Sequence, residues 1–118
     1  MQYLLLIYGS EERWEALTPE EERAVYARYG ELERELAARG GLTGGAELRP
    51  AATATTVRVR DGETLVTDGP FAETREQLGG FFQVECESLE EALEIARRIP
   101  AAEDGAVEVR PQHVRAAP

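Results

Sequence analysis

Residues 79–100 read GGFFQVECESLEEALEIARRIP, and this stretch decides the fold. Two glycines introduce the short apolar run at residues 81–86, which is typical of a buried strand. Ser88 then supplies a helix N-cap, and Glu91 stands three residues later, where a capping box needs it. The apolar side chains that follow have helical spacing, and Pro100 ends the helix. The stretch therefore predicts a strand followed directly by an amphipathic helix.

A similar strand and helix precede this stretch. Residues 3–8 are an apolar run closed by Gly9-Ser10, too short for a helix and typical of a buried strand. The run Thr18-Pro19-Glu20-Glu21 predicts a helix start, because Thr is a favourable N-cap, Pro is favoured at the first helical position and acidic side chains complement the helix dipole. We expect this helix to continue to about Arg39, with Gly40-Gly41 at its end. Its apolar side chains share one face, which should pack on a sheet: Val25, Tyr29, Leu32 and Leu36.

The rest of the chain is predicted to form strands. Residues 53–60 alternate, with valines on one face and arginines on the other, and Asp61-Gly62 predicts a type I′ turn into residues 63–67. Two further strands are expected at residues 42–50, with a bend at Gly44-Gly45, and at residues 106–110.

The order of these elements predicts an α+β fold. It reads β, α, β, hairpin, β, α, β, a ferredoxin-like βαββαβ plan with both helices on one face of an antiparallel sheet. We expect one domain over residues 1–110 and a C-terminal tail over residues 111–118. A chain of 118 residues has no third layer for the other sheet face. A homodimer that closes over this face, giving a dimeric α+β barrel, is the simplest way to cover it.

Composition excludes several classes of function. The net charge of −10 repels the phosphate backbone and no basic cluster offsets it, so we expect no direct binding to nucleic acid. The start of the chain lacks a basic segment and a long apolar span, so we expect no export signal, no membrane contact and a cytoplasmic location. Cys86 is the only cysteine and is interpreted as a small core residue.

Residues 66–82 differ from the rest, and we interpret them as a structured loop dense in Gly, Pro, Asp and aromatic residues. Asp68 is the candidate catalytic residue. If it lies against Phe71 and Phe81, burial would favour its protonated form and suit it to acid/base work or ligand anchoring. The alternative is an aspartate that only locks the turn by bonding forward to backbone N–H groups, and this is the simpler interpretation.

Other side chains carry similar alternatives. Tyrosine hydroxyls would bind a ligand between subunits or find a protein partner in the core, and arginines would bind an anion or pair with surface acids. Trp14 would cover the sheet edge or line the cavity mouth. The candidate ligand-binding residues are Tyr8, Tyr29, Arg58, Gly69, Pro70, Phe71, Arg75 and Phe81. His113 is the only histidine and lies in the tail, so we expect neither a metal site nor a cofactor.

The same residues carry a family resemblance. Asp68-Gly69-Pro70-Phe71, with Glu73-Thr74-Arg75-Glu76, Gly79-Gly80-Phe81 and Ala54-Thr55-Thr56-Val57-Arg58, is similar to the DGPF-domain family within the wider YCII-related group. The likeness extends over nearly the whole chain. It implies a dimeric α+β barrel of ferredoxin-like subunits.

The resemblance implies two alternative functions. The YCII group is suspected of enzyme activity because of a histidine and an aspartate in a cleft, whereas DGPF members are often encoded beside, or fused to, extracytoplasmic-function sigma factors. In this chain Tyr29 takes the position of that histidine and Ile99-Pro100 replaces an Asp-Pro, so the dyad is missing. One hypothesis is therefore a dimer with a small-molecule-binding or enzyme-like cavity and an unassigned reaction. The other is a non-catalytic interaction module that acts with a sigma factor.

Overall fold

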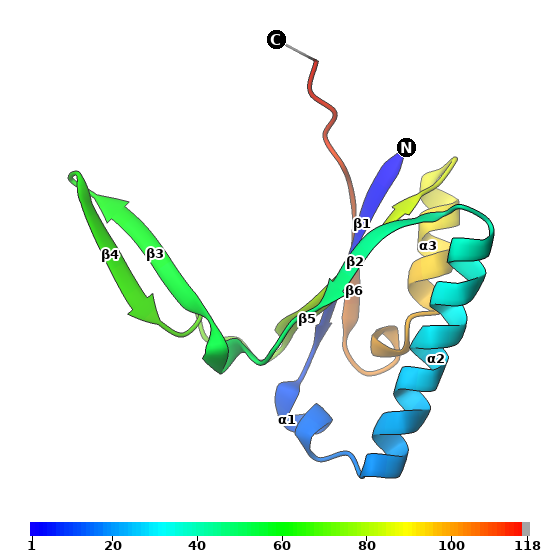
Figure 1. Ribbon diagram of the computed structural model, residues 1–118, viewed down its shortest axis with the longest axis horizontal. Coiled ribbons are helices and arrows are strands. Elements are labelled where there is room, and N and C mark those ends of the chain that lie inside the picture. The colour runs from blue at the N-terminus through cyan, green and yellow to red at the C-terminus, as the bar shows by residue number, and fades with distance from the viewer. Residues whose placement is uncertain (117–118) are drawn as a thin grey trace.

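The computed structural model describes residues 1–116 and confirms a mixed α+β fold. Its main sheet has the strand order β2-β5-β1-β6, and every neighbouring pair is antiparallel. Helices α2 (Pro19–Ala38) and α3 (Leu89–Arg97) lie on one face of this sheet (Figure 1). The strands are β1 (Gln2–Gly9), β2 (Leu42–Glu47), β5 (Gln77–Glu85) and β6 (Ala106–Pro111). This arrangement is compatible with a ferredoxin-like fold.

The predicted capping residues begin both long helices. In α2 the Thr18 hydroxyl accepts from the Glu21 backbone N–H at 3.1 Å, and the Glu21 carboxylate accepts from the Thr18 N–H at 2.9 Å. In α3 the Ser88 hydroxyl accepts from the Glu91 N–H at 3.2 Å, but the Glu91 carboxylate accepts from the N–H of Glu87. The capping box of α2 is therefore complete, whereas in α3 the second bond is displaced by one residue.

A short helix, α1 (Glu11–Glu15), was not expected from the sequence. Ser10 caps it by accepting from the Arg13 N–H, and acidic residues follow the cap directly. This signal resembles that of the longer helices, but a single turn has too few apolar residues to show a helical period. Two 3-10 turns, Ala51–Thr53 and Pro100–Ala102, complete the helical segments of the described chain.

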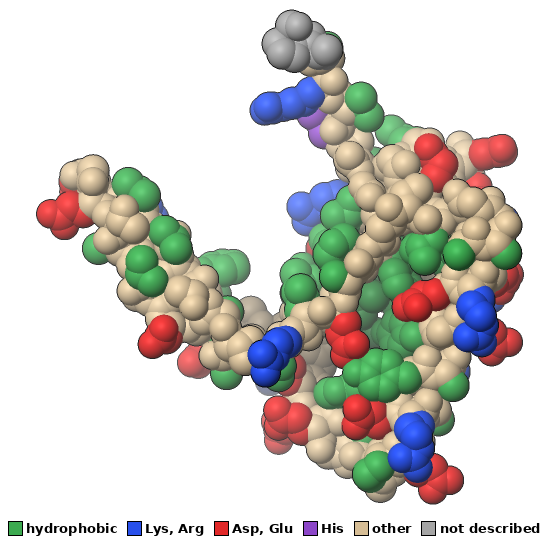
Figure 2. All heavy atoms as spheres, in the orientation of Figure 1, with side chains coloured by type: hydrophobic (Ala, Val, Ile, Leu, Met, Phe, Trp, Pro, Cys, Tyr) green, Lys and Arg blue, Asp and Glu red, His purple; other side chains and the backbone are tan. Residues whose placement is uncertain are grey.

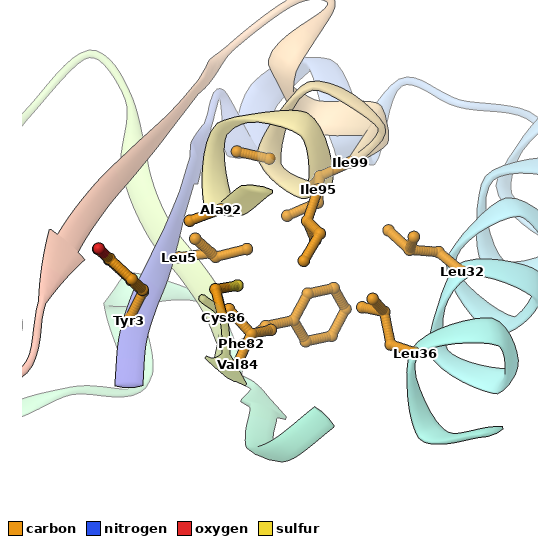
Figure 3. Close-up of a cluster of buried hydrophobic side chains, with 11 residues drawn as sticks. Tyr3, Leu5, Leu32, Leu36, Phe82, Val84, Cys86, Ala92, Ile95 and Ile99 are labelled. Carbon is orange, nitrogen blue, oxygen red and sulfur yellow. The ribbon is translucent and has the colours of Figure 1, made fainter. Parts of the chain in front are cut away.

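The hydrophobic core lies between the main sheet and the two long helices. Figure 3 shows side chains from β1, β5, α2 and α3 meeting there, with Leu5, Leu36 and Ile99 fully buried. Only Leu32 and Leu36 of α2 are buried, and both lie in its second half. The first half of α2 is therefore not packed into the core, and this leaves space beside the sheet.

Strand β5 begins earlier than the sequence suggested. We interpreted residues 66–82 as a loop, but β4 (Glu63–Asp68) takes its first residues and β5 takes its last ones. The loop interpretation is therefore wrong at both ends. The register between β1 and β5 shifts between Ile7 and Tyr8, where Gly79 is the extra residue of a bulge. Glycine is a signal for a turn and for a bulge alike, which is why the sequence did not separate them.

Strands β3 (Thr55–Arg60) and β4 form a separate two-stranded sheet, here called the arm. Asp61 and Gly62 both have positive φ, at 52° and 79°, which confirms the predicted type I′ turn. The arm projects away from the body (Figure 1). The register puts Val57, Val59 and Val66 on one face, where they are 61%, 59% and 62% exposed.

The face of the main sheet opposite the helices is also uncovered in the protomer. Alternation and register put Leu4, Leu6 and Phe81 on this face, and all three are only half-buried. Figure 2 shows open space between the arm and the sheet, with hydrophobic side chains on both sides of it. Among residues 1–116, no helix has the length and apolar character needed to cross a lipid bilayer.

Candidate functional site

A hollow of about 1120 Å³ lies between the main sheet, α1 and the first half of α2. It forms because α2 touches the core only through its second half, so its first half stands away from the ends of β2 and β5. The size is suited to a small organic molecule. In Figure 2, hydrophobic side chains lie in the opening between β2 and α2, and acidic side chains stand among them.

Aromatic side chains from three elements line the hollow. Trp14 of α1 packs edge to face on Tyr26 of α2, with ring centroids 5.4 Å apart. Tyr29 of α2 packs on Phe82 of β5, with centroids 6.3 Å apart. The two pairs give the hollow an aromatic wall from mouth to floor, since Tyr26 is 42% exposed and Phe82 is buried.

Tyr26 and Glu47 join α2 to the end of β2 across the hollow. The Tyr26 hydroxyl donates to Glu47 Oε1 at 2.6 Å. This bond, together with burial and the negative charge of Glu47, raises the pKa of Tyr26 to about 12. Tyr26 is therefore a neutral hydrogen-bond donor at physiological pH.

Tyr29 lies deeper than Tyr26. Burial raises the pKa of its hydroxyl, and the backbone of nearby Ala101 works in the opposite direction. Pro100 and Ala101 line the hollow beside it. At this place Tyr29, Pro100 and Ala101 offer the hollow a hydroxyl and apolar surface. Ile99, the residue before the proline, is fully buried in the core and does not line the hollow.

Two of the arginines at the hollow are engaged by acids. Arg28 donates to both carboxylate oxygens of Glu103, at 2.9 and 3.0 Å, and this pairing holds the pKa of Glu103 below its usual range. Arg13 lies 3.9 Å from the Asp104 carboxylate. Both pairs tie helical segments to the turn before β6, so they shape one rim of the hollow.

The bond between Tyr26 and Glu47 predicts a distinct alkaline titration. The folded-state pKa lies above the ordinary value of 10, so the stability contributed by this bond is complete below pH 10 and is lost as pH rises through about 12. When tyrosine ionisation is followed by absorbance, the part of the signal that Tyr26→Phe removes belongs to Tyr26 and should titrate near pH 12. Glu47→Gln should move it toward 10, whereas Glu31→Gln, on the exposed side of α2, should not. If Tyr26 of the wild type titrates with a midpoint near pH 10, its hydrogen bond with Glu47 is contradicted.

The structure brings only some of the sequence-predicted residues to the hollow. Tyr29 and Phe81 both border the hollow, although strand alternation directs the Phe81 side chain to the uncovered face of the sheet. Tyr8 lies beside it at the end of β1, on the uncovered sheet face, paired with Leu78 and Ala106. Arg75 lies in the loop before β5 and is exposed. The remaining candidates belong to the arm and its base: Arg58, Asp68, Gly69, Pro70 and Phe71.

The Asp68 corner lies at the base of the arm and does not line the hollow of its own protomer. The Gly69 N–H donates to the Ala54 carbonyl at 2.7 Å, and the Thr56 hydroxyl donates to the Gly69 carbonyl at 2.8 Å. Gly69 has a φ of 92°, which suits glycine. Within residues 1–116 the Asp68 carboxylate has no hydrogen-bond partner, and Phe71 is 77% exposed. The backbone, not the Asp68 side chain, closes this turn.

Sequence reasoning missed Tyr26 and Glu47 as site residues. Tyr26 precedes Tyr29 by three positions on a helix, a spacing that puts both near one face. Glu47 carries no such signal, because it is one of many acids and ends a strand predicted only roughly. Trp14 lines the hollow within one protomer, whereas the cavity expected from the sequence lies between two subunits. In the described part of the chain, no three histidine, cysteine or acidic side chains are grouped to hold a metal ion.

The antiparallel sheet, its two covering helices and the aromatic hollow define a small α+β protein with a ligand-sized cavity. Residues 1–113 match the family model of the YCII-related domain. The chain therefore belongs to the YCII-related family, as its sequence resemblance indicated. An uncharacterized protein of Rhizobium meliloti (strain 1021) is similar to it, with 42% identity over 113 residues, covering 94% of this chain and 91% of that protein.

Proposed function

We propose that this protein is a DGPF-type member of the YCII-related family that binds a small molecule in the hollow as a homodimer. The observation that carries the proposal is the hollow itself, which combines aromatic walls with a few polar groups. Cavities of this kind are the usual place for ligands. The DGPF assignment is supported by the Asp68-Gly69-Pro70-Phe71 sequence.

A substitution inside the hollow tests this proposal. Val25 of α2 is half-buried and lines the hollow, so Val25→Trp should fill part of it. Ala24 is exposed on the same helix and does not line it, so Ala24→Trp is the matched control. In a thermal-shift screen of metabolites, we expect at least one compound at ten times its Kd to raise the Tm of the wild type and Ala24→Trp by about 5 °C.

The same compound should leave the Tm of Val25→Trp unchanged. If every stabilising compound protects all three proteins equally, binding occurs elsewhere and the proposal for the hollow fails. A crystal structure with the selected compound then gives its position directly.

The homodimer is supported by two uncovered apolar surfaces in one protomer. The arm is a two-stranded hairpin, and such hairpins are marginally stable unless they pack on something. Its valine face carries three exposed valines, and the uncovered sheet face carries half-buried Leu4, Leu6 and Phe81, so both present apolar side chains that a partner would cover. A second copy presents the same two surfaces, so each can cover the other in an isologous interface.

The dimer also gives a role to the candidates on the arm. Asp68 shares the face of Val57 and Val66, because these residues alternate along the paired strands. Docking of this face would bring the Asp68 carboxylate against the second copy. Under this proposal Asp68 and Phe71 contribute to a ligand site only across the subunit interface, whereas Arg58 lies on the opposite face of the arm and takes no part in it.

An interaction module is the second candidate function. The exposed valines of the arm favour it, since a partner protein such as an extracytoplasmic-function sigma factor would cover them as well as a second copy would. The oligomeric state of the wild type, together with the effect of charges placed on the valine face, separates the homodimer from the interaction module. An interaction module requires a wild-type protein that stays monomeric alone and binds a sigma factor through the valine face.

A further inference from the structure

We propose that the hollow selects a small organic cation, namely an amine or quaternary ammonium compound with apolar substituents. This inference rests on the proposed function, because it names the ligand class of the same cavity. The juxtaposition that carries it is an aromatic pair, Trp14 and Tyr26, beside the Glu47 carboxylate at the mouth of the hollow.

The aromatic pair supplies the first element of a cation site. A positive charge is attracted to the face of an aromatic ring, most strongly to tryptophan. The Trp14 and Tyr26 rings are nearly perpendicular, at 89°, so they present a corner of two differently oriented surfaces. Such a corner contacts a methylated ammonium group or an alkyl ammonium group from two sides.

The Glu47 carboxylate supplies the second element. One of its oxygens accepts from the Tyr26 hydroxyl, and its other oxygen has no hydrogen-bond partner among the described residues. The bond with Tyr26 holds the carboxylate next to the aromatic corner. A bound ammonium group would therefore meet a fixed negative charge as well as the ring surfaces.

The remaining charges at the hollow favour a cation over an anion. The lining holds five acidic side chains, Glu11, Glu33, Glu47, Glu103 and Asp104, against three arginines. Arg28 is held by both oxygens of Glu103, and Arg13 faces Asp104. Arg49 is then the one lining arginine without an acid partner in residues 1–116, against Glu11, Glu33 and Glu47.

An anionic ligand would have to compete for the arginines. Binding a carboxylate at Arg28 would mean breaking its two-bond pairing with Glu103, and the net charge of −10 opposes the approach of any anion. A cation needs no such rearrangement. The same field that repels an anion draws the cation toward the hollow.

Trp14 makes this selection measurable, because it is the only tryptophan in the chain. Its fluorescence therefore reports on the hollow. We would titrate the wild type with choline and with its uncharged isostere 3,3-dimethylbutan-1-ol, and with phenethylamine against phenylacetate. We expect choline and phenethylamine to change Trp14 fluorescence. Each should bind about ten times more tightly than the compound paired with it, 3,3-dimethylbutan-1-ol or phenylacetate.

Two conservative variants complete the test. Glu47→Gln keeps a side-chain oxygen for Tyr26 but removes the charge, so it should lose most of the tenfold preference. Glu31→Gln removes a charge from the exposed side of α2, outside the lining of the hollow. This variant should keep the tenfold preference for the cation. Circular dichroism of each variant confirms that the fold is intact.

The outcomes separate this inference from the proposed function. If the uncharged isostere or phenylacetate binds as well as its cation, or if neither cation binds, the selection of cations is overturned. The hollow remains a binding site in that case, provided that the metabolite screen yields a compound sensitive to Val25→Trp. If Glu31→Gln and Glu47→Gln weaken the cation equally, the charge of the whole chain is responsible and the Glu47 site is wrong.

Discussion

Replacing Gly80 by alanine is expected to destabilise the protein by about 2 to 3 kcal/mol. Gly80 is buried in β5, and a Cβ atom there would lie 2.6 Å from the Ala46 carbonyl oxygen and 3.3 Å from the Glu47 Cα. Both atoms belong to the backbone of β2, so no side-chain rotation relieves the clash. The two strands would have to separate, and Glu47 would move away from Tyr26.

The neighbouring Gly79 provides the matched control. The nearest atom to a Cβ at this position is the Ile7 carbonyl oxygen, at 3.9 Å, which is an ordinary contact. Gly79→Ala should therefore be neutral, or slightly stabilising because alanine restricts the unfolded chain. Urea denaturation at one fixed protein concentration measures both variants. Equal stability of the two would show that β2 and β5 are not as close as described.

The second large effect is expected on association. Val57→Lys combined with Val66→Glu puts an opposite-charge pair at directly opposed positions of the arm, so the hairpin itself should be preserved. Both valines are exposed in the protomer, so its stability should change little. In a dimer that buries this face, the desolvated charges should weaken association by several kcal/mol. Sedimentation velocity should then show a dimeric wild type and a monomeric variant.

Leu65→Glu is the control for this experiment. Leu65 lies on the opposite face of the arm, across from Arg58, so the new charge has a partner and the valine face is untouched. This variant should remain dimeric. A wild type that sediments as a monomer would refute the homodimer, and dissociation by Leu65→Glu alone would place the interface on the other face of the arm.

Local signals in the sequence predicted most of the elements. The Thr18 and Ser88 caps and the Asp61-Gly62 turn depend on neighbouring residues only, so they could be predicted without knowledge of the rest of the fold. The short helix α1 was not predicted, because a single helical turn shows no hydrophobic periodicity. The early start of β5 was not predicted, because Gly79, which is typical of a turn, belongs to a bulge within the strand.

The hollow could not be predicted in the same way. Val25 and Tyr29 belong to the same apolar stripe of α2 as Leu32 and Leu36, and the period of the sequence treats all four alike. In the structure only the last two are buried, whereas Val25 and Tyr29 line the hollow. Which part of a helix packs into the core depends on contacts between distant segments, so the residues lining the hollow became visible only in three dimensions.

The projecting arm also changes how the particle scatters X-rays. The protomer has a radius of gyration of 16.5 Å, whereas a compact chain of this length would have about 13 to 14 Å. Two interlocked copies packed to ordinary density would have only about 17 to 18 Å. Association would therefore double the mass while hardly changing the radius, so forward scattering intensity, and not apparent size, distinguishes the lone protomer from the pair.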